Sequence, residues 1–230
     1  MKIGLLECDH VAEQFRHIAG DYKDMFQALL PAVDYEFFDV INGHFPDSVQ
    51  RCDAFICTGS KYSVYEKIDW ILRLKAFVRD LYTWQKGFLG ICFGHQMLAE
   101  ALGGRVQKSS VGWCVGVHSF EISRQENWMQ PFQSKVNLLM LCQDQVQILP
   151  ENSAILAGTA DCPVGMFKVG QKMLGIQAHP EFPKEYDKAI FSERLRSIDS
   201  QKVKSGIESL ELPLDATLVG EWIMNFLRNP

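Results

Sequence analysis

The chain has 230 residues, of which 47% are hydrophobic and 22% are charged, and its formal net charge is −5. A hydrophobic fraction of this size supports a substantial core and excludes an intrinsically disordered chain. The small negative charge comes without a basic patch, and no apolar run approaches the length of a membrane-spanning helix, so neither nucleic acid nor membrane is expected as a partner.

The first half of the chain alternates between short apolar strands and amphipathic helices. We expect strands at 3–6, 35–41, 54–57 and 88–91, and helices at 21–30, 69–81 and 93–102. Asp21 with Asp24 opens the first helix and Pro31 ends it, while Asp69 caps the second. Such alternation is typical of a parallel sheet covered by helices.

The second half of the chain is dominated by strands. We expect them at 115–122, 135–142, 154–157, 166–169 and 173–178, followed by a helix at about 216–227. Residues 115–122 alternate between the two faces in the manner of an antiparallel strand. The predicted fold is therefore α/β in three layers, with a mostly parallel central sheet flanked by helices and an added antiparallel sheet in the second half. No linker rich in Pro, Gly or Ser divides the halves, so we expect one domain over residues 1–230.

The seven cysteines favour a reducing compartment. Their number is odd, no two of them form a C-x-x-C pair, and several lie in apolar runs. A disulfide framework is therefore not expected, and the absence of an N-terminal secretion signal agrees with a cytoplasmic protein.

The run Gly90-Ile91-Cys92-Phe93-Gly94 is the strongest local signal for chemistry. An expected strand precedes it and an expected helix follows, which is the setting of a strained turn that presents a nucleophile. Glycines two residues on either side of Cys92 avoid collisions with the neighbouring elements. The helix N-terminus favours a thiolate, and the N–H of Phe93 is free to face a developing oxyanion. The alternative is an ordinary buried cysteine in a strand–turn–helix unit.

A thiol nucleophile needs a base, and His179 has the best setting among the six histidines. It follows the end of an expected strand, Pro180 stiffens the turn after it, and Glu181 lies two residues on. In an extended segment the Glu181 carboxylate projects to the same side as the imidazole and can orient it. A loop histidine without a catalytic role is the alternative, and the residues alone leave both interpretations open.

Together these segments resemble the class I glutamine amidotransferase family, and the resemblance covers nearly the whole chain. The segments that carry it are Gly90-Ile91-Cys92-Phe93-Gly94-His95-Gln96, His179-Pro180-Glu181, Thr58-Gly59-Ser60, Ala101-Leu102-Gly103-Gly104, and Gln143-Asp144-Gln145-Val146 before Leu149-Pro150. The combination is specific to the family, whereas any one segment alone is not.

The resemblance implies a role for each matching residue. Cys92 would be the nucleophile, His179 the general base and acid, and Glu181 the carboxylate that orients it. The backbone N–H groups of Gly59 and Phe93 would form the oxyanion hole. The glutamyl moiety would be held by three further residues, Gln96, Cys142 and Gln143.

Two departures from the family pattern bear on the substrate. The oxyanion loop reads Gly59-Ser60-Lys61 where many members have Gly-Gly-Pro, and Cys142 stands where many members have His. The loop and the Val111-Gly112-Trp113 segment look closer to a standalone subgroup, similar to plant γ-glutamyl peptidases and to the glutaminase part of GMP synthetase.

Three functions are consistent with these residues. The first is cysteine-dependent hydrolysis of a γ-glutamyl amide or isopeptide through a thioester. The second is a glutaminase subunit that delivers ammonia to a separate synthetase partner, since no synthetase region follows before Pro230. The third is a non-catalytic binding module, against which the intact Cys92, His179 and Glu181 set argues.

We expect a γ-glutamyl peptide to be the better substrate, because Lys61, Tyr62 and Tyr65 follow Gly59 and offer a cation and two aromatic rings to a peptide leaving group. No metal site and no cofactor are expected. His179 and Glu181 lack further ligands at suitable spacing, and no phosphate-binding loop is present in the sequence.

Overall fold

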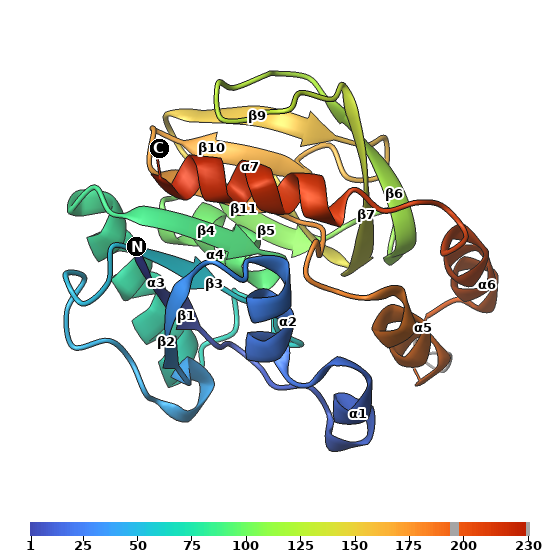
Figure 1. Ribbon diagram of the computed structural model, residues 1–230, viewed down its shortest axis with the longest axis horizontal. Helices are drawn as coiled ribbons and strands as arrows, with labels where there is room; N and C mark the ends of the chain where they lie inside the picture. The colour runs from blue at the N-terminus through green and yellow to red at the C-terminus, as the bar shows by residue number, and fades with distance from the viewer. Residues whose placement is uncertain (194–197, 229–230) are drawn as a thin grey trace.

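The computed structural model of the protein, drawn in Figure 1, describes residues 1–193 and 198–228. Its strands are β1 (Lys2–Leu6), β2 (Asp34–Phe38), β3 (Ala54–Cys57), β4 (Gly87–Ile91), β5 (Arg105–Lys108), β6 (Cys114–Ile122), β7 (Lys135–Cys142), β8 (Asp144–Ile148), β9 (Ser153–Gly158), β10 (Met166–Val169) and β11 (Met173–Ile176). Its α-helices are α1 (Arg16–Ala19), α2 (Tyr22–Leu29), α3 (Asp69–Thr83), α4 (Phe93–Ala101), α5 (Lys184–Glu193), α6 (Ser200–Ser209) and α7 (Ala216–Arg228). Short 3₁₀ turns lie at Glu13–Phe15 and Val40–Asn42.

Nine strands form one sheet in the order β2-β1-β3-β4-β11-β10-β9-β6-β7. The first five strands in this order pair in parallel. From β11 onward each pair is antiparallel. The antiparallel strands of the second half therefore extend the same sheet, and β5 with β8 forms a small separate antiparallel pair.

Helices cover both faces of the parallel part of the sheet (Figure 1). On one face, Ile3 and Leu5 of β1 pack in a cluster with Phe26 of α2 and Trp222 of α7. On the opposite face, strand residues such as Leu6 and Phe55 pack in a second cluster with α3 and α4. The alternation of side chains along each strand supplies apolar groups to both faces, as a sheet buried on both sides requires. The predicted α/β class, with a mostly parallel central sheet between helices, is confirmed.

Several boundaries differ from those expected. The strand expected at 35–41 ends at Phe38, and residues 40–42 form a 3₁₀ turn that closes on Gly43 with φ +85°. Asp69 is the first residue of α3 rather than its cap, because Ile68 holds the extended N-cap conformation. Asp21 and Asp24 form a capping box at the start of α2, where the sequence predicts the first helix to begin.

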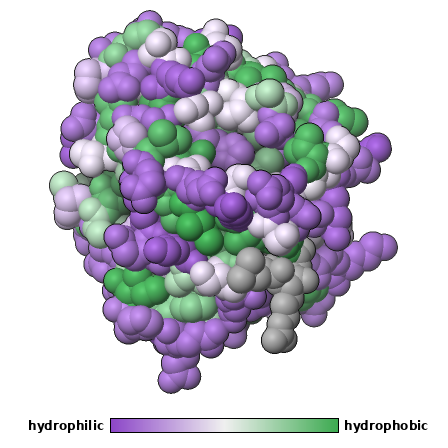
Figure 2. Space-filling view, turned by 90° about the vertical axis from the view of Figure 1, so that its right-hand side faces the viewer, coloured by the Kyte–Doolittle hydropathy of each residue, from purple (hydrophilic) through white to green (hydrophobic). Residues whose placement is uncertain are grey.

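Helices α5 and α6 were not predicted, and they lie on the side of the molecule where β6 and β7 end the sheet (Figure 1). Their buried residues, among them Tyr186, Phe191 and Val203, form a third cluster with residues of β6 and β7. Figure 2 shows this side of the molecule, where hydrophilic side chains predominate and hydrophobic ones form separate patches. Across residues 1–193 and 198–228, no helix combines the length and the apolar character needed to cross a membrane.

Candidate active site

Cys92 occupies a strained turn between β4 and α4. Its backbone has φ +50° and ψ −100°, a region that side-chain-bearing residues rarely adopt. A Cβ at Gly90 would lie 2.2 Å from the carbonyl oxygen of Gly94, and a Cβ at Gly94 would lie 2.4 Å from that of Cys57. The two glycines of the motif are therefore required by the close approach of strand and helix.

Strand β11 connects this turn to His179. The Cys92 N–H donates to the carbonyl of Ile176, the last residue of β11, at 2.9 Å. The chain then runs on to His179, whose own N–H donates to the carbonyl of Leu139 in β7 at 2.8 Å. The imidazole is thus held beside the Cys92 thiol, and only 6% of Cys92 and 4% of His179 is exposed.

Glu181 is hydrogen-bonded to the imidazole, with 2.8 Å between its Oε1 and Nδ1 of His179. Burial by itself lowers the pKa of His179, but the charges of Glu181 and Cys92, together with hydrogen bonds to both, raise that pKa well above its ordinary value. These partners favour the imidazolium, because each of them carries or can carry a negative charge. The structure therefore brings Cys92, His179 and Glu181 into one continuous set.

Gly59 lies directly against this set. A Cβ at Gly59 would lie 2.9 Å from Cε1 of His179 and 3.7 Å from Cβ of Cys92. The loop is held by Thr58, whose hydroxyl donates to the Gly59 carbonyl at 3.0 Å and accepts the N–H of Cys8 at 2.9 Å. Phe93, the other expected oxyanion residue, is the first residue of α4, and its side chain is buried against Trp70.

Two cavities meet at Cys92, and Ser60, Lys61, Cys92 and Leu141 line both of them. The first, of about 210 Å³, is named here the aromatic cavity, and its walls include Phe15, Tyr22, His179, Phe182 and Tyr186. The second, of about 220 Å³, is named the amide cavity, and its walls include Gln96, Lys108, Trp113, Cys142 and Gln143. The thiol can therefore be approached from two sides.

The three residues expected to hold the glutamyl moiety all line the amide cavity. The side-chain amide of Gln96 donates to the carbonyl of Asp144 at 2.8 Å and to Oε1 of Gln177 at 3.1 Å, so it braces the cavity wall. Burial raises the pKa of the Cys142 thiol well above its ordinary value. Cys142 therefore presents a neutral thiol in the wall of this cavity.

The two tyrosines expected near a leaving group lie in different places relative to the cavities. Tyr62 lines the amide cavity and packs edge-on against Trp70, with 5.6 Å between the ring centroids. The Tyr65 hydroxyl donates to Asp144 at 3.2 Å, and Tyr65 lines neither cavity. Lys61 lies at the junction of both cavities, and its Nζ is 3.1 Å from Oδ1 of Asp9.

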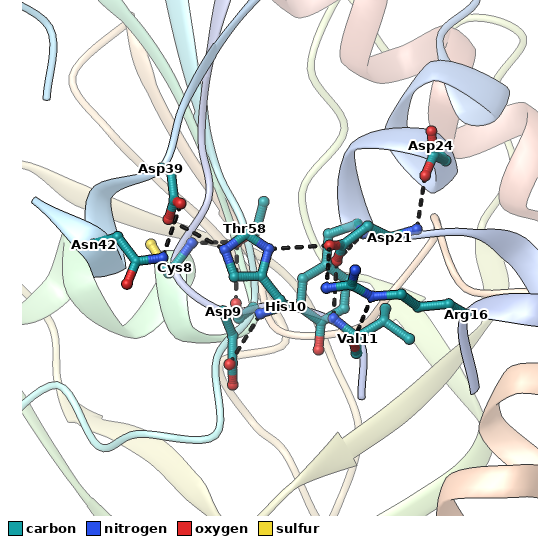
Figure 3. Close-up of polar contacts among 12 residues, drawn as sticks. Cys8, Asp9, His10, Val11, Arg16, Asp21, Asp24, Asp39, Asn42 and Thr58 are labelled. Carbon is teal, nitrogen blue, oxygen red and sulfur yellow. Dashed lines mark hydrogen bonds and ion pairs between the residues drawn. The ribbon is translucent and has the colours of Figure 1, made fainter. Parts of the chain in front are cut away.

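Asp9 and His10 are wall residues of the aromatic cavity that sequence reasoning missed. Figure 3 shows the His10 ring between two carboxylates, with 3.0 Å from Nδ1 to Asp21 and 3.2 Å from Nε2 to Asp39. Their position directly after the first parallel strand could have indicated that they lie at the site, because ligand sites of open α/β sheets lie at the carboxyl ends of strands.

A metal site is not part of this arrangement. Within residues 1–193 and 198–228, no group of three or more His, Cys, Asp or Glu side chains is placed to hold a metal ion. The chemistry that the site offers is that of a buried thiol beside an imidazole held by a carboxylate.

Comparisons with known proteins agree with the resemblance stated from the motifs. The family model for glutamine amidotransferase class-I matches residues 53–198, well over half of the chain. The chain is 29% identical to γ-glutamyl peptidase 3 of Arabidopsis thaliana over 97% of its own length and 94% of that protein. It is 28% identical to a glutamine-hydrolyzing GMP synthase subunit of Saccharolobus solfataricus over 79% of its own length and 89% of that protein. A solved glutamine amidotransferase from Thermotoga maritima shares the fold, with a TM-score of 0.75 and 19% identity over 98% of this chain and 96% of that one.

Proposed function

This chain belongs to the class-I glutamine amidotransferase family, and on that premise we propose that it hydrolyses the isopeptide bond of a γ-glutamyl peptide through a thioester on Cys92. The Cys92 sulfur attacks the γ-carbonyl carbon, and the N–H groups of Gly59 and Phe93 stabilise the oxyanion. The C–S bond forms, and the C–N bond breaks as His179 gives its proton to the leaving amine.

The second half of the reaction releases glutamate. His179, now neutral, takes a proton from water, and the oxygen of that water attacks the thioester carbonyl. The C–O bond forms, the C–S bond breaks, and the thiolate returns to its pairing with the imidazolium. Glu181 orients the imidazole in both half-reactions through its 2.8 Å contact with Nδ1.

The observation that favours a γ-glutamyl peptide over glutamine as the substrate is that two cavities meet at Cys92. The amide cavity, with Gln96, Cys142 and Gln143 in its walls, takes the glutamyl moiety. The aromatic cavity lies on the His179 side, where the leaving amine receives its proton. Ammonia needs no such space, whereas the amino-acid or dipeptide portion of a γ-glutamyl peptide does. A relative named γ-glutamyl peptidase also supports this interpretation.

Lys61 is the residue best placed to select a peptide leaving group. Lys61 lines both cavities, its side chain is 59% exposed, and the contact of its ammonium group with Asp9 uses one of three donors. A carboxylate on the leaving group can therefore bind to the donors that remain.

A second function is supported by a different relative. The likeness to the GMP synthase subunit of Saccharolobus solfataricus favours a glutaminase that passes ammonia to a separate synthetase partner. The steps on Cys92 and His179 would be the same, but the aromatic cavity would then carry ammonia rather than hold a leaving group.

The two functions are separated by comparing kcat/KM for glutamine, a γ-glutamyl dipeptide and glutathione, following released amine or ammonia. We expect the purified chain to prefer the peptides, and Lys61→Ala to lower kcat/KM for the peptides roughly 3- to 10-fold while sparing glutamine, as a lost exposed ion pair would. Lys67→Ala is the matched control, because Lys67 follows closely in the chain and lines neither cavity. Faster turnover of glutamine than of peptides by the wild type would favour the ammonia-supplying function, and equal losses for all substrates would remove Lys61 from leaving-group binding.

A further inference from the structure

The His179 imidazole lies flat on the ring of Phe182. The two ring centroids are 3.9 Å apart and the ring planes differ by 11°. Phe182 also stacks with Tyr22 of α2, with 5.9 Å between centroids and planes that differ by 10°. Tyr186 of α5 meets the same phenylalanine edge-on at 4.9 Å. Phe182 is 4% exposed, so its ring is fixed by packing from two helices.

This stack restrains the plane of the imidazole, in addition to the contacts of that ring with Glu181 and Cys92. The hydrogen bond to Glu181 fixes Nδ1, but it permits the ring to rotate about the line that joins the two groups. A flat contact at 3.9 Å blocks that rotation, because any tilt drives the imidazole into Phe182. The face of an aromatic ring is also electron-rich, so it attracts an imidazolium more strongly than a neutral imidazole.

We propose that Phe182 is a positioning residue of the hydrolytic site: its ring sets the plane of the His179 imidazole toward Cys92 and stabilises the imidazolium. The proposal rests on the proposed function for its catalytic consequence, although the stack itself can be measured without turnover. Phe182 does not touch the reacting atoms and acts only through His179.

Other charged and titratable groups also face His179 and must be held constant in any test. Glu181 and Cys92 contact the imidazole directly. Around the aromatic cavity lie Asp9, His10, Tyr22, Lys61, Tyr186 and Glu193. Substitutions at Phe182 leave all of these residues in place. A change in the pKa of His179 can therefore be attributed to the loss of the Phe182 ring.

The experiment replaces Phe182 with Leu, which keeps an apolar side chain and removes the aromatic face. In the protein without substrate, the NMR signals of the His179 ring are followed as a function of pH to measure its pKa. The signals are assigned to His179 because they are absent from His179→Gln. We expect the pKa of His179 to fall by about one pH unit in Phe182→Leu and to stay at the wild-type value in Phe182→Tyr. In turnover, the alkaline limb of the pH profile of kcat/KM should move down by the same amount, because that limb reports loss of the imidazolium proton.

Phe191→Leu is the matched control, since Phe191 is also a buried phenylalanine of the cluster that contains α5. It should lower thermal stability by a similar amount without moving either titration. An unchanged His179 titration in Phe182→Leu, or an equal change in Phe191→Leu, overturns the proposal. If the wild type turns over no γ-glutamyl substrate while the NMR result is as expected, the proposed function fails and the role of Phe182 in holding the imidazole stands.

Discussion

His179 and Glu181 are hydrogen-bonded to each other, but the proposed mechanism gives them different roles. The imidazole carries the proton in both half-reactions, whereas Glu181 only orients it through Nδ1. The imidazole needs an acceptor for its Nδ1 proton, and the oxygen of a neutral amide in place of the carboxylate can still accept it, as in the Cys-His-Asn arrangement of papain-like proteases.

From this difference we expect His179→Ala to lower kcat by about 10³- to 10⁴-fold and Glu181→Gln by only about 10- to 100-fold. Single-turnover rates with a γ-glutamyl peptide measure both, and Cys92→Ser, which removes the thiol with little change in volume, gives the background. A larger loss for Glu181→Gln than for His179→Ala would reverse the two assignments.

Cys92, His179 and Glu181 were singled out from short local motifs, whereas Asp9 and His10 were not predicted. Cys92 and its two glycines share five positions of the sequence, and His179 and Glu181 lie two residues apart, so local spacing was enough to single them out. Asp9 and His10 reach the same cavity from the loop after β1, more than 80 residues away in the chain. No periodicity or motif marks such a pair, because only the order of strands in the sheet brings them near Cys92.

The close contact between the start of α4 and the end of β3 predicts the effect of a substitution at Gly94. In Gly94→Ala the new methyl group would lie 2.4 Å from the Cys57 carbonyl, so α4 has to move away from β3. We expect a loss of about 2 kcal/mol or more in the free energy of unfolding, as overpacking of a well-packed contact gives. Activity should fall with it, because the same movement displaces Cys92.

The control for that substitution is Gly170→Ala. Gly170 lies in the positive-φ region, at +57°, and its Cβ would meet nothing within 4 Å. It should cost about 1 kcal/mol through backbone strain alone and leave kcat/KM unchanged. Urea unfolding and steady-state kinetics are measured on both variants, and a Gly94→Ala protein as active and as stable as Gly170→Ala would show that the turn tolerates a methyl group.

The elements that the sequence predicts well are those whose side chains are buried on both faces or alternate cleanly. The strands expected at 54–57, 135–142 and 166–169 have those bounds in the structure. By contrast β5, with three of its four residues exposed, has no apolar run to reveal it. Helices α5 and α6 are rich in Lys, Glu and Ser, and they become helices by docking a few apolar residues on β6 and β7.

On the scale of the whole molecule, His10 joins three segments that are distant in sequence. Its ring contacts Asp21 at the start of α2 and Asp39 after β2, while His10 itself follows β1 (Figure 3). Burial lowers the pKa of His10, but the hydrogen bonds to Asp39 and Asp21 outweigh it, and the pKa is raised. The charged form of His10 is therefore favoured in the folded state. Its contribution to the free energy of unfolding is fully present below the ordinary pKa of about 6.5, and it is lost as pH rises through the pKa of the folded state.

We therefore expect His10→Gln to lower the free energy of unfolding more at pH 5.5 than at pH 8.5. The difference should be less than about 1 kcal/mol, because solvent reaches the ring and screens both ion pairs. Urea unfolding at the two pH values measures it. His17→Gln, at an exposed position of α1, serves as the control for replacing a surface histidine. A larger loss at the alkaline value would mean that the neutral ring is the form the fold prefers.

The position of β11 in the sheet has a consequence for the folding of the nascent chain during translation. This strand lies between β4 and β10, and it pairs with β4 although about 80 residues separate the two in sequence. A nascent chain that has reached only β10 has made Cys92 but leaves the edge of β4 open, and His179 has not yet been translated. The parallel part of the sheet is completed by the same segment that carries His179 to the thiol. Maturation of the site and closure of the sheet are therefore one late, long-range event, of the kind that slows folding and leaves a strand edge exposed until it occurs.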